Sequence, residues 1–317
     1  MTLTCSVTTA AGEPPGHPAR VRVELRHEDG ASGVSFTHPS AASRVDTLAR
    51  EVLASADPRG VTSLFDQLLS AESALGGGSH ASAALDVALW NLLAQRRSEP
   101  LWKCLGGSEP RAQAYVTVPS ECSTDPVLDR WCKRIGLESG IRGVKLEATA
   151  DAQSDQRRLA RIAAAMPAGD RPVALMLDFG GRFTAKECER RIACIERELE
   201  LAFVEAPALA GDFLGCHRVG RAVKASVCSP PGMDAGSGWL GYFDAHAVDV
   251  VQLDLETMGL SGALRIADAA YAFELPVTVA YYPGNLGVHL SGALPYFMNV
   301  EVDGLRPGMA GQGMVRA

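Results

Sequence analysis

The sequence lacks several features that would assign a protein to a class at once. It has no apolar run long enough to cross a bilayer, and no stretch resembles a secretory signal peptide. Its 8 cysteines are scattered without a Cys-x-x-Cys pair, which predicts free thiols rather than disulfides or a zinc site. A formal net charge of -7 argues against a nucleic-acid surface. These absences favour a cytoplasmic protein with neither a membrane nor a nucleic-acid partner.

Apolar residues are plentiful, and they recur in short runs that end in charge. The 317 residues are 47% hydrophobic, enough for a sizeable core. Four apolar runs each end in an acid, and the first three follow one another at roughly 25 to 35 residues, the length of one strand-helix unit. They lie at residues 143–147, 173–178, 201–205 and 250–254. The pattern predicts successive βα units with charged strand ends.

Asp178 carries the clearest of these signals, because Gly180 and Gly181 follow it at the end of a fully apolar run. In a parallel barrel the carboxyl ends of the strands form the rim where chemistry is done, so Asp178 is a candidate metal ligand or base. The alternative is that Asp178 caps the following helix, expected over residues 184–200. Thr184 already stands at the capping position, which favours the functional interpretation.

The first hundred residues predict a different kind of unit. Residues 21–26 alternate like a half-buried strand, Asp29-Gly30 is a hairpin turn signal, and residues 33–36 supply the return strand. Helical patterns follow at 42–55 and 60–69, and a proline-containing stretch at 12–16 predicts a mobile loop beside the site. Residues 80–95 are apolar around most of a helix, which indicates burial at a domain junction.

The sequence of that junction helix resembles the signature helix of the mandelate racemase and muconate-lactonising branch of the enolase superfamily. The resemblance rests on Ala84, Asp86 and Trp90 with the residues between them, followed by the Pro-Leu…Leu-Gly-Gly pattern of residues 100–107. It implies an α/β fold: an α+β capping domain at 1–107 and a modified (β/α)7β, TIM-like barrel at 108–300. A C-terminal segment at 301–317 is expected to pack back on the capping domain. The resemblance also implies a homo-oligomer.

Similar enzymes use a divalent metal, normally Mg²⁺, to stabilise the enediolate formed when a base removes the proton α to a carboxylate. The resemblance implies metal ligands at Asp178 and Glu205. The third ligand is expected within residues 223–230, where the sequence is interpreted as having Ala225 at the ligand position. This departure leaves Mg²⁺ binding open, and Glu147 is an alternative third ligand.

The positions of the catalytic bases also depart from the family. Its Lys-x-Lys strand appears here as Lys145-Leu146-Glu147, so Lys145 is expected to bind the substrate carboxylate while Glu147 replaces the usual basic lysine. Strand alternation places both side chains on one inward face. Asp254 matches an aspartate that normally partners a histidine, yet residues 276–282 contain no histidine.

Tyrosines stand where that histidine would be. Tyr281 is a candidate general acid, although Tyr281 and Tyr282 fit an aromatic wall equally well. Glu301 matches an acid of the last strand. His289, in an apolar helix, is expected to be a packed structural residue, and Cys228 is weighed as a nucleophile near the altered ligand position.

The predicted rim holds five acids, at positions 147, 178, 205, 254 and 301. They cannot all remain ionised without a partner, so either a cation lies among them or some have raised pKa values. Lys145 and Lys224 are the candidate cations. The sequence therefore predicts a lyase or isomerase that acts by proton abstraction or elimination on a small carboxylate, with a non-standard site. A metal-independent enzyme and a non-catalytic binding or scaffolding relative are the alternatives, and ordinary racemase activity is disfavoured.

Overall fold

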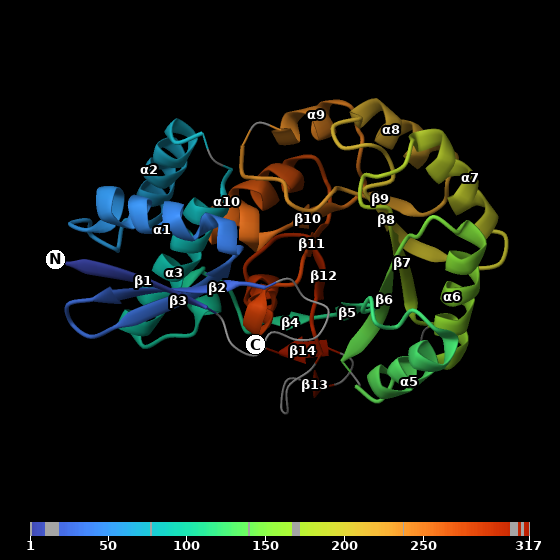
Figure 1. Cartoon of the computed structure of the whole chain (residues 1–317), viewed down its shortest axis with the longest axis horizontal. Coiled ribbons are helices and arrows are strands. Elements are labelled where there is room, and N and C mark those ends of the chain that lie inside the picture. Colours follow the sequence, from blue (N-terminus) through green and yellow to red (C-terminus); the bar gives the residue numbers. More distant parts are fainter. Residues whose placement is uncertain are drawn as a thin grey trace.

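The computed structural model describes residues 2–9, 19–76, 78–138, 140–166, 172–236, 238–304, 310–311 and 314–316. A small antiparallel sheet with its helices lies beside a ring of strands surrounded by helices (Figure 1). The eight strands of the ring form one parallel sheet. This is the predicted fold: a TIM-like barrel preceded by an α+β domain.

The N-terminal sheet is a meander with order β1-β2-β3. The predicted hairpin is confirmed, with Gly30 at φ 91° in the turn between β2 and β3. Strand β1 was not predicted, and it pairs antiparallel with β2. The elements are β1 (Leu3–Thr9), β2 (Val21–His27), β3 (Ser32–Thr37), η1 (Pro39–Ala41), α1 (Ala42–Leu48), η2 (Ala49–Leu53), α2 (Val61–Ala74), α3 (His80–Arg97) and α4 (Leu101–Cys104).

The barrel sheet has the order β10-β11-β12-β5-β6-β7-β8-β9. A parallel bridge between Cys228 and Val250 joins the two ends of this order, which closes the ring. The strands are β5 (Ala114–Thr117), β6 (Ile141–Glu147), β7 (Ala174–Asp178), β8 (Leu201–Glu205), β9 (Ser226–Cys228), β10 (Val251–Leu253), β11 (Val277–Val279) and β12 (Phe297–Glu301). The helices are α5 (Asp125–Ile135), α6 (Ala152–Ala165), α7 (Ala185–Ile195), α8 (Phe213–Ala222), α9 (Gly238–Asp244), α10 (Leu255–Ala272) and η3 (Pro283–Gly292).

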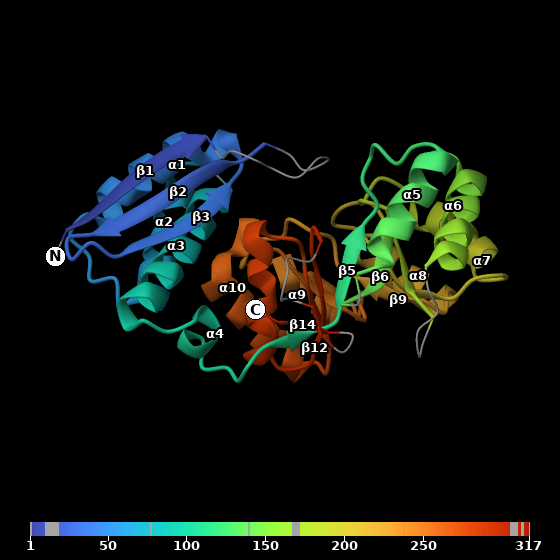
Figure 2. The same cartoon turned by 90° about the horizontal axis from the view of Figure 1, so that it is seen from below.

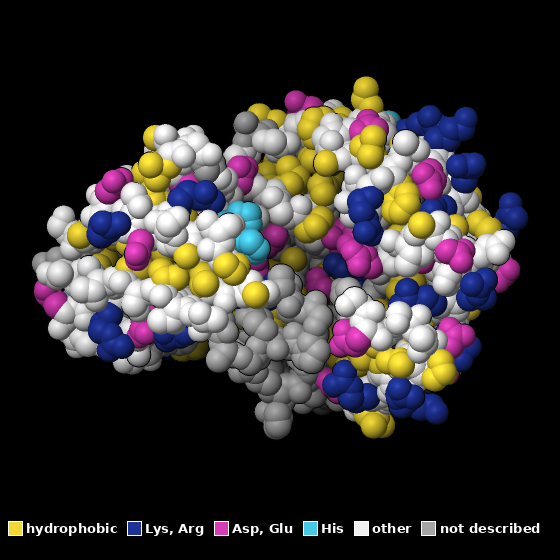
Figure 3. All heavy atoms as spheres, viewed as in Figure 1, with side chains coloured by type: hydrophobic (Ala, Val, Ile, Leu, Met, Phe, Trp, Pro, Cys, Tyr) yellow, Lys and Arg dark blue, Asp and Glu magenta, His cyan; other side chains and the backbone are white. Residues whose placement is uncertain are grey.

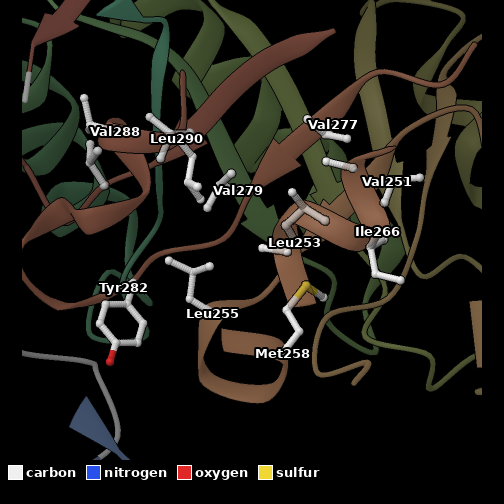
Figure 4. Close-up of a cluster of buried hydrophobic side chains, with 14 of the residues drawn as sticks. Val251, Leu253, Leu255, Met258, Ile266, Val277, Val279, Tyr282, Val288 and Leu290 are labelled. Carbon is white, nitrogen blue, oxygen red and sulfur yellow. The ribbon is translucent and has the colours of Figure 1, made fainter. Parts of the chain in front are cut away.

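The apolar core continues from the barrel wall to the capping domain. Figure 4 shows side chains of β10, β11 and α10 gathered around Leu253, Val279 and Met258, all fully buried. At the edge of this cluster the Tyr282 hydroxyl accepts from the Phe36 amide at 2.8 Å and donates to the Phe36 carbonyl at 3.0 Å. Tyr282 therefore ties the end of β11 to β3 of the capping domain, which makes it a structural residue.

Helix α3 lies between the capping sheet and α10 (Figure 2), and the signature residues explain how it is held there. Asp86 is fully buried, and its carboxylate accepts from the Ser261 amide at 2.8 Å and the Ser261 hydroxyl at 2.6 Å. One turn later, Trp90 donates to the same hydroxyl at 2.9 Å. Gly259 breaks α10 at φ 64°, and a Cβ there would lie 2.6 Å from the Asp86 carboxylate. The motif thus docks the capping domain onto the barrel.

Replacing Asp86 by asparagine is expected to flatten part of the pH dependence of stability. Burial raises the pKa of Asp86 to about 7. In the unfolded chain an aspartate has a pKa of about 4, so between about pH 4 and about pH 7 only the folded state keeps the proton on Asp86. The resulting contribution to the free energy of unfolding is complete below about pH 4 and is lost as the pH rises toward about 7. Asparagine does not titrate and can still bond to Ser261. Melting temperatures from pH 4 to about 8 check this. The exposed control Asp244→Asn should keep the wild-type profile, and a D86N profile parallel to wild type would contradict the assignment.

Some of the described C-terminal residues form a small sheet with the segment that leads into the barrel. Strand β14 (Met314–Arg316) pairs antiparallel with β4 (Arg111–Ala112), just before the first barrel strand, and with β13 (Ala310–Gly311). The expected packing of residues 301–317 on the capping domain stays a prediction, and Glu301 itself ends β12. The predicted loop at 12–16 lies outside the described residues. In the described part of the chain, no helix combines the length and apolar character needed to cross a bilayer.

Candidate active site

The predicted site residues meet at the carboxyl ends of the barrel strands. Glu147 pairs in register with Asp178, and Asp178 with Glu205, so the three acids form one row across adjacent strands. A cavity of about 350 Å³ lies over this row. All seven predicted residues line it: Lys145, Glu147, Asp178, Glu205, Asp254, Tyr281 and Glu301. In Figure 3, acidic side chains gather in the middle of the face, between the capping domain and the barrel helices.

A buried lysine lies at the centre of the site. The Lys145 ammonium donates to Glu205 Oε2 at 2.9 Å and to Glu301 Oε2 at 3.1 Å. The other oxygen of Glu205 accepts from the Gln252 amide at 3.0 Å, and the other oxygen of Glu301 accepts from the Thr117 hydroxyl. Both glutamates therefore have both oxygens engaged by donors.

Burial and charge set the protonation of this network. Burial favours loss of the Lys145 proton, but the carboxylates of Glu205 and Glu301 outweigh it and raise the pKa of the ammonium well above its usual value. Burial raises the pKa of Asp178, and it raises that of Glu205 to about 7. For Glu301, burial is outweighed by Lys145 and Thr117, and the pKa falls below its usual value. The number of acids calls for a cation among them or for raised pKa values, and both occur. The Lys145 ammonium lies between Glu205 and Glu301, and the pKa values of Asp178 and Glu205 are raised.

Glu147 stands at the mouth of the cavity. It ends β6 two residues after Lys145, and both side chains line the cavity, which confirms that they share the inward face. The Glu147 side chain is 62% exposed, and its Oε1 lies 3.6 Å from the Arg182 guanidinium. An exposed ion pair of this kind contributes little to stability, so Glu147 is available to a ligand.

Asp254 and Tyr281 form part of the cavity wall opposite Glu147. Asp254 caps α10: one oxygen accepts from the Glu256 amide at 2.9 Å and the other from the Gly232 amide at 3.1 Å. Burial raises its pKa to about 6. These bonds give Asp254 a clear structural task, and its catalytic role stays a prediction. The Tyr281 hydroxyl donates to Asp303 at 3.3 Å, and the guanidinium carbon of Arg20 lies 5.5 Å from the ring centre.

Comparison with known proteins assigns the family. The model of the enolase C-terminal domain-like family matches residues 128–307. The chain belongs to this enolase family. Its fold matches a racemase from Streptomyces coelicolor solved with bound magnesium, with a TM-score of 0.84 at 20% identity over 99% of this chain and 93% of that one. The matched family model places the chain in the mandelate racemase and muconate-lactonising branch.

Similar enzymes of the family are lyases and isomerases. The chain is 27% identical over 301 residues to an L-talarate/galactarate dehydratase of Salmonella typhimurium, covering 91% of this chain and 74% of that one. It is 25% identical over 248 residues to an L-Ala-D/L-Glu epimerase of Clostridium acetobutylicum, covering 75% and 66%. An L-talarate dehydratase from a Polaromonas species, solved with Mg and L-glucarate, matches with a TM-score of 0.78 at 25% identity over 95% and 85%.

The structure corrects the third ligand position of this enolase-family site. Ala225 precedes β9, and its amide donates to Glu196 at the other end of the barrel. The residue in register with Glu205 is Cys228. Strand β9 has only three residues and no clear periodicity, so the sequence does not show which of its ends faces the site. The predicted position, Ala225, is therefore three residues from Cys228 and lies at the opposite end of the strand. Lys224 lies at that far end as well, so it does not join the site.

Several residues of the site carried no local signal in the sequence. Arg20 comes from the capping domain and pairs with Glu256, while Thr117 and Gln252 each bond to one glutamate of the network. The thiol of Cys228 is fully buried, and burial raises its pKa well above the usual value. A neutral, buried thiol does not meet the requirements for an activated nucleophile.

These donors do not fit the three-carboxylate magnesium site of the family. Mg²⁺ requires near-octahedral oxygen ligands at short distance. Glu205 already has both oxygens engaged, and the residue in register with it on β9 is Cys228 rather than an acid. Within the described ranges, no group of three or more His, Cys, Asp or Glu residues is arranged to hold a metal ion.

Proposed function

We propose that the protein is an isomerase or lyase that removes the proton α to the carboxylate of a small substrate. The observation that carries the proposal is the buried Lys145 ammonium, held by Glu205 and Glu301 beneath a cavity that Glu147 and Tyr281 also line. The dehydratase and epimerase relatives support the reaction class.

Lys145 is suited to bind the substrate carboxylate. An ammonium has three N–H donors, and two of them point to Glu205 and Glu301. The third can donate to a carboxylate that enters the cavity. This contact fixes the substrate at the floor of the site and draws the negative charge that develops on deprotonation toward a fixed cation.

Glu147 is suited to be the base. It lies two residues beyond Lys145 on the same face, so its Cα is about 6.6 Å nearer the mouth at a rise of about 3.3 Å per residue. A substrate anchored through its carboxylate at Lys145 therefore presents its α carbon below Glu147. The Glu147 carboxylate takes the α proton, and the C–H electron pair moves into the enediolate.

Tyr281 is suited to supply a proton from another side of the cavity. It follows β11, which is separated from β6 in the ring by β12 and β5. In an elimination the phenol protonates the departing hydroxyl, so water leaves as the C–O bond breaks; in an isomerisation it protonates the α carbon. The Arg20 guanidinium beside the ring balances the phenolate that remains.

Exchange of the α proton with solvent deuterium tests the proposal. Sugar acids, sugar diacids and dipeptides are incubated with the enzyme in D₂O, and deuterium at the α carbon and loss of water are followed by mass spectrometry. We expect exchange or dehydration of at least one class, and loss of both in Lys145→Ala. Lys224→Ala, at the far end of the barrel, is the matched control and keeps the activity. Ligand binding without exchange in any class would instead favour a non-catalytic binding protein.

A further inference from the structure

We propose that this site works without a divalent metal, with the Lys145 ammonium as its fixed positive charge and Cys228 as the residue that closes the metal position. The inference rests on the proposed function, and three features of the rim support it: the ligand set, the position of the ammonium and the packing around the thiol.

The ligand set is incomplete at one defined position. Strand pairing fixes the row Asp178, Glu205 and Cys228. A nearby acid could take the place of Cys228 in this row only if the register between β8 and β9 changed. Glu147, at the opposite end of the row, pairs with Asp178 rather than with Cys228. Its side chain is 62% exposed and faces Arg182, so it does not complete a compact ligand set around Glu205.

The ammonium already neutralises the carboxylate that a metal would need. Lys145 Nζ lies 2.9 Å from Glu205 Oε2, and Gln252 donates to Oε1 of the same group at 3.0 Å. A divalent ion bound to Glu205 would have to displace one of these donors and would lie beside a second positive charge. Like charges at such a separation in a buried site repel strongly.

The thiol is packed as part of the barrel interior. Cys228 is fully buried in a cluster with Tyr115, Met176 and Phe203. Its sulfur lies 3.9 Å from the Gln252 carbonyl oxygen, which orients the amide whose nitrogen donates to Glu205. Cys228 thus supports the hydrogen bond that occupies Glu205, in addition to removing the third carboxylate.

A single ammonium stabilises a dianionic intermediate less than a divalent ion does. The site therefore suits substrates in which the full dianion never accumulates. These are carboxylates whose α proton is acidified by a second carbonyl group, or whose β leaving group departs as the proton is removed.

Thermal-shift titrations with metal ions test the inference. Wild-type protein and Cys228→Glu are stripped with EDTA and titrated with MgCl₂, MnCl₂ and ZnCl₂ up to millimolar concentration, with NaCl to match ionic strength. We expect no saturable rise in Tm for the wild type and a saturable rise with Mg²⁺ for Cys228→Glu, because glutamate restores an oxygen ligand in register with Glu205. Cys228→Gln, of similar size and uncharged, should show no rise.

The outcomes separate the inference from the proposed function. A saturable rise of the wild-type Tm, or deuterium exchange that EDTA abolishes and Mg²⁺ restores, would overturn metal independence while leaving the reaction intact. Exchange that survives EDTA supports both. Absence of exchange with an unchanged Tm removes the proposed function and, with it, the catalytic part of the inference. If Cys228→Glu fails to fold, the wild-type titration and elemental analysis of the purified protein still decide the question.

Discussion

Lys145→Met is expected to lower the free energy of unfolding by about 3 to 5 kcal/mol, the range found when one partner of a buried ion pair is removed. Lys145, Glu205 and Glu301 have side chains only 6%, 1% and 11% exposed. Methionine keeps most of the apolar stem but leaves two carboxylates without their cation. Urea unfolding at constant pH measures the loss, and the same variant should no longer bind the substrate carboxylate.

Two further variants show whether the loss comes from the charges. Adding Glu205→Gln to Lys145→Met removes one unpaired carboxylate and keeps an amide that can bond to Gln252, so the double variant should be more stable than Lys145→Met alone. Lys224→Met, outside the site, should change stability by no more than about 0.5 kcal/mol. Wild-type stability for Lys145→Met would contradict the buried network.

The ends of four barrel strands, β6, β7, β8 and β10, could be predicted because each follows an apolar run closed by an acidic residue. This pattern predicts Glu147, Asp178, Glu205 and Asp254 on the rim, the family resemblance adds Lys145 and Glu301, and the structure brings all six together. A charge at the end of a buried strand is costly unless the surroundings use it, so the pattern is informative even in one sequence.

The third ligand position was assigned wrongly because β9 is too short for its residues to show which end is which. Cys228 is apolar enough to read as core, and only the pairing with Glu205 identifies it as a rim residue. Strand β1 was missed for a related reason: its exposed face and its partner β2 are defined by tertiary contacts.

The sequence could also predict that the acids need a cation, but not which one. Five acids close together need either a cation among them or bound protons on some of them. The cation can be an ammonium or a metal ion, and the sequence does not distinguish the two. The distances from Lys145 to Glu205 and Glu301 place an ammonium among the acids, and they depend on the register of β6 against β8 and β12 around the ring. Arg20 illustrates the same limit, since it comes from the capping domain and reaches the site through the docking of that domain on the barrel.

Glu147→Gln is expected to lower kcat by about 10²- to 10⁴-fold, the usual contribution of a positioned general base, with little change in KM. Glutamine keeps the size of the side chain and removes the proton acceptor. The side chain is 62% exposed, so the Tm should stay within about 2 °C of wild type. The rate of deuterium exchange at saturating substrate measures the effect.

The matched control separates proton transfer from local charge. Arg182→Gln removes the ion partner of Glu147 but leaves the carboxylate, so its kcat should fall by less than about tenfold. A Glu147→Gln variant that exchanges as fast as wild type would exclude Glu147 as the base. Asp178, the adjacent acid in the row, would then be the next residue to replace, because it is the other carboxylate in register with both Glu147 and Glu205.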